Sequence, residues 1–102
     1  MAIEYFVYSD LDKVEVERRL IVAADAANSL WESWGVRGDL GPFHEEIMAE
    51  YGVGKGFKTQ VYCRHHKEHS VRAREAMLAF FESLPRRKLL LNGDVLVAFR
   101  PE

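Results

Sequence analysis

Two apolar segments near the end of the chain, residues 88–91 and 94–100, are separated by the dipeptide Asn92-Gly93. Asn-Gly is the strongest short-range signal for a two-residue hairpin, because both central residues of that turn take positive φ angles. The dipeptide therefore predicts two adjacent antiparallel strands, and it restricts the fold to one that contains an antiparallel sheet.

Five further elements follow from residue patterns. Residues 3–8 and 57–63 are rich in aromatic and β-branched side chains and predict strands. Residues 10–34, 43–51 and 67–84 have apolar residues at steps of three and four and predict helices. Gly35 is the expected C-cap of the first helix. Near its start, Val14-Glu15-Val16-Glu17 alternates between apolar and polar residues, so residues 12–18 are either helical or extended. The spaced apolar positions of this helix are Leu20, Ala23, Ala27, Leu30 and Trp34.

This order of elements predicts an α+β fold. We expect a two-layer sandwich with a mostly antiparallel sheet of about four strands and helices on one face, an arrangement related to the ferredoxin-like fold. The 102 residues fit a single domain, 1–102. A domain of this length buries roughly 65% of the surface that its unfolded chain exposes, which suffices for one core.

Composition narrows the class of protein. A formal net charge of −2 argues against general attraction to nucleic acid or membrane surfaces. Cys63 is the one cysteine, so no internal disulfide demands an oxidising compartment. The first residues lack the pattern of a signal peptide, and the longest apolar run, Leu20 to Ala24, is far shorter than a membrane span. We therefore expect a cytoplasmic protein with no membrane partner.

The predicted strands are apolar on both faces. In residues 3–8, Phe6 and Tyr8 lie on the face opposite to Tyr5, and Tyr62 has the same outward phase in the strand at 57–63. A sheet covered by helices on one face would show polar residues on the other. Three explanations remain open: the short helix or glycine-rich loops cover the second face, two copies pair through it as a homodimer, or it lines a pocket for a small molecule.

Three of the four histidines and the single cysteine lie between Cys63 and His69. If a helix begins by His65, then His65 and His69 share a face, and Cys63 or the distant His44 adds a third ligand of a kind that suits zinc. The spacing matches no established zinc motif. The alternative is that Cys63 is a buried core residue and the histidines belong to a solvated turn. A nucleophilic Cys–His pair would need Cys63 to be exposed.

These patterns favour a small non-enzymatic binding protein that acts through an apolar sheet face and self-associates as a homodimer or binds another protein. Its predicted interface residues are Phe6, Tyr8 and Tyr62, and no cofactor is required. The alternative is a metal- or small-molecule-binding protein, including an enzyme, built around Cys63, His65 and His69. The sequence predicts no nucleic-acid partner and shows no serine triad, paired-carboxylate site or dinucleotide fingerprint.

Overall fold

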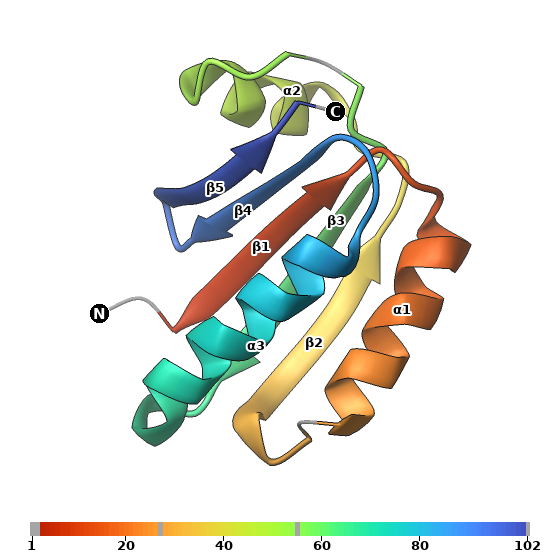
Figure 1. Ribbon diagram of the computed structural model, residues 1–102. Helices are drawn as coiled ribbons and strands as arrows, with labels where there is room; N and C mark the ends of the chain where they lie inside the picture. Colours follow the sequence, from red (N-terminus) through yellow and green to blue (C-terminus); the bar gives the residue numbers. More distant parts are fainter. Residues whose placement is uncertain (1–2, 27, 55, 102) are drawn as a thin grey trace.

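The computed structural model describes residues 3–26, 28–54 and 56–101, which form one open sheet with helices on both of its sides (Figure 1). The order of elements agrees with the prediction except in the region before residue 38. The elements are β1 (Glu4–Ser9), α1 (Lys13–Ala26), the short 3-10 helix η1 (Asn28–Leu30), β2 (Trp31–Arg37), α2 (Pro42–Glu50), β3 (Thr59–His65), the 3-10 helix η2 (Lys67–His69), α3 (Ser70–Ser83), β4 (Lys88–Asn92) and β5 (Val95–Arg100).

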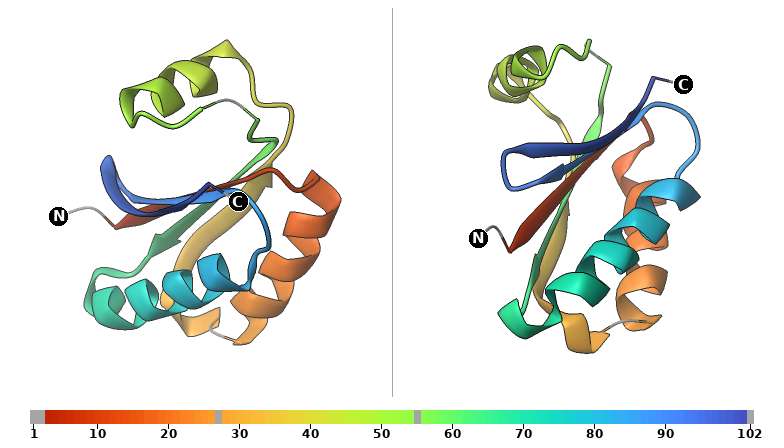
Figure 2. Two further views of the ribbon diagram at one scale, coloured as in Figure 1. Left: turned by 45° about the horizontal axis from the view of Figure 1, so that its top comes forward. Right: turned by 60° about the vertical axis from the view of Figure 1, so that its left-hand side comes forward.

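The sheet has five strands in the order β2-β3-β1-β4-β5, and each neighbouring pair is antiparallel. Helices α1 and α3 cover one face, while α2 lies over part of the other (Figure 2). The predicted α+β class with a mostly antiparallel sheet is confirmed. The sheet has one strand more than expected, and α2 lies on the side opposite to the other two helices.

The additional strand is β2, in a segment that the sequence pattern assigned to the end of the first helix. Residues 12–18 are helical from Lys13 on, but α1 ends at Ala26 and Trp31 begins a strand. A β-bulge between Trp31 and Ser33 places Trp31 opposite His65 and Trp34 opposite Cys63, so both tryptophans project to the same face. The bulge thus gives a strand the three-residue spacing of a helix. The expected apolar position Ala27 lies outside the described residues.

The main hydrophobic core fills the space between the sheet and the helices α1 and α3. Alternate residues of the central strands point into it, and one apolar stripe of each helix meets them. These buried residues are Tyr5, Val7, Val16, Leu20, Val61, Cys63, Ala73, Met77, Phe80, Phe81, Leu84 and Leu90.

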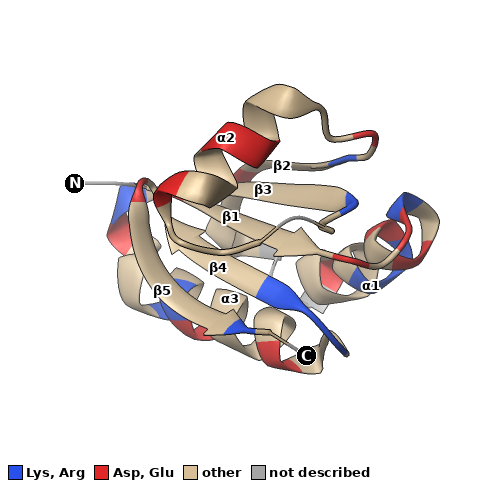
Figure 3. Ribbon diagram, turned by 90° about the horizontal axis from the view of Figure 1, so that it is seen from above, with Lys and Arg blue, Asp and Glu red and all other residues tan. Residues whose placement is uncertain are grey.

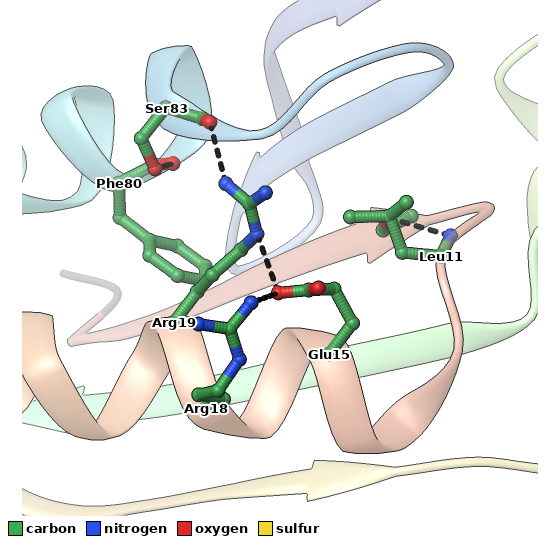
Figure 4. Close-up of polar contacts among 7 residues, drawn as sticks. Leu11, Glu15, Arg18, Arg19, Phe80 and Ser83 are labelled. Carbon is green, nitrogen blue, oxygen red and sulfur yellow. Dashed lines mark hydrogen bonds and ion pairs between the residues drawn. The ribbon is translucent and has the colours of Figure 1, made fainter.

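Helices α1 and α3 are also joined by polar contacts at their outer edge (Figure 4). Glu15 accepts hydrogen bonds from the guanidinium groups of Arg18 and Arg19, the second over 3.0 Å. Arg19 Nη1 in turn donates to the backbone oxygen of Ser83 near the end of α3, over 3.1 Å. The contacts with Arg18 and Arg19 lower the pKa of Glu15, although burial opposes them. The ion pairs lie within α1 and are too exposed to contribute much free energy, and the bond from Arg19 to Ser83 links α1 to α3.

Lys88 at the start of β4 is buried and terminates α3. Its Nζ donates to the backbone oxygens of Phe81 and Leu84 over 2.7 and 2.8 Å, and it lies 4.7 Å from the ring centre of Phe81. The last carbonyls of a helix have no partners within the helix and carry a partial negative charge. A buried ammonium group therefore satisfies them and attaches β4 to the end of α3.

A second, smaller core lies on the other face of the sheet, beneath α2. Its buried members come from α2 and the segment after it, and from β1 and β4. The short helix therefore covers part of the second face within one chain, which is the first of the three explanations left open by the sequence. These residues are Tyr8, Met48, Val53, Leu89 and Leu91. Among the residues described, no helix combines the length and the apolar character needed to traverse a membrane.

Candidate functional site

A groove of about 400 Å³ lies between one side of α2 and the sheet. We call it the α2 groove. Its floor is formed by Phe6, Tyr8 and Leu91 of the sheet, and its wall by Phe43 and Ile47 of α2. This volume lies in the range of about 300–1,000 Å³ that is usual for binding pockets, which are mostly apolar with a few placed polar groups. The α2 groove is therefore a candidate for a binding site.

Local sequence explains the orientation of α2. Pro42 stands in the first turn, where its missing N–H costs nothing, and Gly52 follows the C-cap with a φ of 70°. Residues 43, 47 and 50 recur at helical spacing and face the groove. His44 and Met48, one position further on, are the buried residues of the helix. One stripe of α2 thus packs on the sheet, and the neighbouring stripe remains open.

A short hydrogen-bonded chain connects α2 with the sheet at the floor of the groove. Gln60 Nε2 donates to the Tyr8 hydroxyl over 2.8 Å, and that hydroxyl lies 3.2 Å from His44 Nδ1. The hydroxyl can accept from Gln60 and still donate its own proton to Nδ1 when that nitrogen is unprotonated. Burial, and then the charge of Arg37, lower the pKa of His44, while burial raises the pKa of Tyr8. Both shifts preserve this donor–acceptor pair near neutral pH.

Charged residues lie at the two ends of the α2 groove and differ in sign. Arg37 ends β2 at one end, whereas Glu50 and Asp94 lie at the other. Figure 3 shows acidic segments on α2 and at the turn between β4 and β5, and a basic segment at the end of β2. Within the described part of the chain, none of these three side chains takes part in an ion pair.

Tyr51 fixes the acidic end of the α2 groove. It is the C-cap of α2, and its hydroxyl donates to the backbone oxygen of Asp94 over 2.6 Å. Burial, followed by the charges of Asp94 and Glu50, raises the pKa of Tyr51, so the hydroxyl keeps its proton. The bond ties the end of the helix to the hairpin turn and holds the two carboxylates near each other.

Exposed aromatic side chains extend this surface beyond the groove. Phe43 is 67% exposed, and Tyr62 is 38% exposed on the same face, where its Cα pairs with that of Phe6. The ring of Tyr62 lies over Gly35 of β2, where an added Cβ would approach its Cε1 to 2.7 Å. The glycine is therefore what lets the ring lie close to the sheet.

The structure brings the predicted interface residues Phe6, Tyr8 and Tyr62 to one face of the sheet, but it does not leave them equally accessible. Tyr8 is only 1% exposed because α2 covers it, whereas Phe6 is partly buried and Tyr62 is open. Tyr8 therefore supports the floor of the α2 groove and offers almost no surface while α2 stays in place. The use of Phe6 and Tyr62 as an interface stays a prediction.

The Cys/His cluster is not assembled as the metal prediction required. His65 ends β3 and is buried, with Nδ1 2.8 Å from the backbone oxygen of His66, so no helix begins there. Cys63 is buried on the same face, and burial raises its pKa to about 12. His69 lies beyond the strand in η2, where its ring contacts His66. In the described residues, no group of three or more His, Cys, Asp or Glu side chains is arranged to hold a metal ion.

Sequence reasoning did not single out Arg37, Glu50, Asp94 or the pairing of His44 with Tyr8. A helical stripe at Phe43 and Ile47 was visible, but its docking on the sheet depends on contacts with residues far away in the chain. The sequence did offer one signal: His44 and Met48 are four residues apart and therefore share one side of a helix, which is the side that the structure buries.

The fold and the α2 groove together define a small α+β domain with an open antiparallel sheet and a partly covered second face. No model of a known protein family matches the sequence, and no curated protein matches it. Among solved structures, one chain of the "CdiA-CT/CdiI toxin and immunity complex from Burkholderia pseudomallei" is similar, with a TM-score of 0.68 and 19% sequence identity over 93% of this chain and 95% of that chain. At this identity the likeness concerns the fold, and it agrees with the α+β sandwich.

Proposed function

We propose that this protein is a binding protein whose partner is another protein, and that the α2 groove with its exposed aromatic rim is the contact surface. The observation that carries the proposal is the exposure of Phe43 and Tyr62 beside an apolar groove on the sheet face away from the main core. Aromatic residues are enriched among the anchors of protein interfaces, since they bury a large area at low entropic cost.

The fold comparison supports the same class of function. The similar chain belongs to a complex of a toxin and an immunity protein. By analogy, we propose a partner that is a different protein, bound in a stoichiometric complex, as in neutralisation of a toxin. Such a role needs a complementary surface and no reaction, which agrees with a surface built from Phe43, Phe6 and Tyr62.

Site-specific photo-crosslinking tests the contact surface. A photoreactive phenylalanine analogue placed at position 43 should crosslink the full chain to one discrete protein in cells that produce it naturally. The same analogue at Val14, which is 79% exposed on α1 on the opposite side of the molecule, is the matched control. A discrete product from position 14 and none from position 43 would place the partner on the helical layer and refute the proposed surface.

The identified partner is then purified and titrated calorimetrically with variants. Phe43→Asp and Tyr62→Asp should each weaken binding by about tenfold or more, since an anchor side chain typically contributes over about 1.4 kcal/mol. Val14→Asp, which adds the same charge, should leave the affinity unchanged. If the crosslinked protein is a second copy of this chain, native mass spectrometry will show a dimer, and the heteromeric part of the proposal is wrong.

A further inference from the structure

We infer that the α2 groove receives an extended segment of the partner protein in one charge order: an acidic residue at the Arg37 end, an apolar residue in the middle and a Lys or Arg at the Glu50–Asp94 end. This inference rests on the proposed function, and it names the chemistry of the part of the partner that enters the groove. Its basis is the alignment of an apolar floor with end charges of opposite sign.

The strand register fixes where the two ends lie. Arg37 pairs with Gln60, and Gln60 pairs with Tyr8, so Arg37 is level with Tyr8 of β1. At the other end the backbone N–H of Gly93, beside Asp94, donates to the oxygen of Glu4 over 2.8 Å. The ends are therefore four residues apart along β1 and three strands apart across the sheet, which corresponds to a diagonal of about 20 Å.

This length suits an extended segment of the partner. At about 3.4 Å per residue, six residues span roughly 20 Å, so one side chain can reach each end while another lies in the middle. The middle of the floor is Phe6, beside Leu91, and Ile47 faces them from α2. This part of the groove is apolar, which selects an aliphatic or aromatic residue for the centre of the segment.

The charges select the direction of the segment. Arg37 lies beside His44, whose pKa it helps to lower, so that end presents one positive charge and a neutral imidazole. Burial, and then the nearby charges of Asp94 and Glu50, raise the pKa of Tyr51, so this end of the groove presents negative charge. A segment in the reverse charge order would place like charges together at both ends, which is the repulsive element that interfaces use for specificity.

Selection from a phage-displayed library of random seven-residue peptides, panned against the purified full chain, tests this inference. The enriched peptides should carry an apolar residue with an acidic residue on one side and Lys or Arg on the other. A peptide synthesised from the consensus is then measured by fluorescence anisotropy. Enrichment of uncharged peptides, of peptides with charges of one sign only, or of no peptides would overturn the inference.

Charge reversal supplies the decisive comparison. In the double variant Glu50→Lys/Asp94→Lys the consensus peptide should bind about tenfold more weakly, and a peptide with its basic residue changed to Glu should regain the lost affinity. Glu17→Lys/Glu75→Lys changes the net charge equally on the exposed helical layer and should have no effect. Unchanged binding to the groove variant would refute the charge order.

The two proposals fail in different ways. If the crosslinked partner loses affinity on Phe43→Asp but binds the Glu50→Lys/Asp94→Lys variant as it binds the unaltered protein, the contact surface is supported and the charge-ordered segment is refuted. If neither Phe43→Asp nor Tyr62→Asp weakens the partner, the proposed function itself is wrong, whatever the peptides show.

Discussion

Replacing Tyr8 with Phe removes a single oxygen atom, and with it the hydrogen-bonded chain that holds α2 on the sheet. The hydroxyl accepts from Gln60 over 2.8 Å and lies 3.2 Å from His44 Nδ1. A buried hydrogen bond contributes about 0.5–1.5 kcal/mol net, and its loss costs more where the abandoned partner cannot reach water. His44 is buried and Gln60 is only partly so, which sets the expected loss at about 1–2 kcal/mol.

A loss of this size is measurable in a domain whose whole stability is about 5–15 kcal/mol. Urea unfolding followed by circular dichroism should show a lower midpoint with an unchanged slope, and the melting temperature should fall by about 5–15 °C. Amide hydrogen exchange should accelerate most in α2, since that helix loses its polar tie to the sheet.

Tyr5→Phe is the matched control for this prediction. Tyr5 lies on the other face of β1 and is as buried as Tyr8, at 2% and 1% exposed respectively. Among the described residues, however, its hydroxyl has no hydrogen-bond partner. Tyr5→Phe should therefore change the free energy of unfolding by less than about 0.5 kcal/mol. Equal losses in the two variants would show that the Tyr8–His44–Gln60 chain contributes nothing, and our account of how α2 is held would be refuted.

Three further predictions concern other buried polar groups. Because the pKa of His44 is lowered in the folded protein, the unfolded chain binds a proton at higher pH than the folded one. The free energy of unfolding should therefore fall as the pH drops below about 6.5. In urea titrations at several pH values, His44→Gln should reduce that fall. Lys88→Met should lower the free energy of unfolding by about 2 kcal/mol, because the carbonyls of Phe81 and Leu84 lose a charged donor; an unchanged midpoint in urea would contradict this. With its pKa raised from 9.0 to about 12, Cys63 should react with a thiol reagent at pH 8 about a thousandfold more slowly than in urea, and rapid labelling of the folded protein would be inconsistent with its burial.

Much of the fold could be predicted where a signal was local. The hairpin of β4 and β5 was predicted from Asn92-Gly93, but its two turn residues are Gly93 and Asp94, because Asn92 still pairs with Val95. Pro42 marks the start of α2. The segment from Trp31 to Trp34 was assigned wrongly, because a bulge puts two tryptophans three residues apart on one face of a strand. Local spacing could not distinguish a helix from a bulged strand here, since β2 owes its conformation to pairing with β3, about thirty residues further along the chain.

The candidate site was predictable in part. Alternation placed Phe6 and Tyr62 on one face of the sheet, and their pairing in the structure agrees with that placement. The groove itself depends on how α2 docks. The charge order depends on Arg37 and Asp94, which are far apart in sequence and are placed at opposite ends of one groove only by the pairing of the strands. The histidine cluster attracted attention because its members are close in sequence, but Cys63 and His65 are buried in β3, whereas His69 lies beyond the strand in η2.

The position of β1 has a consequence for biosynthesis. β1 is the central strand of the sheet, and Tyr5 pairs with Asn92, which lies 87 residues further along the chain. Ribosomes add about 5–20 residues per second, so one edge of β1 lacks its partner for roughly 5–20 s during synthesis. Until β4 emerges, the nascent chain keeps one edge of an apolar strand unpaired, which is the kind of segment that chaperones bind and that aggregates when synthesis stalls. Removing residues 88–102 would therefore remove both β4 and β5 and turn the central strand β1 into an exposed edge strand.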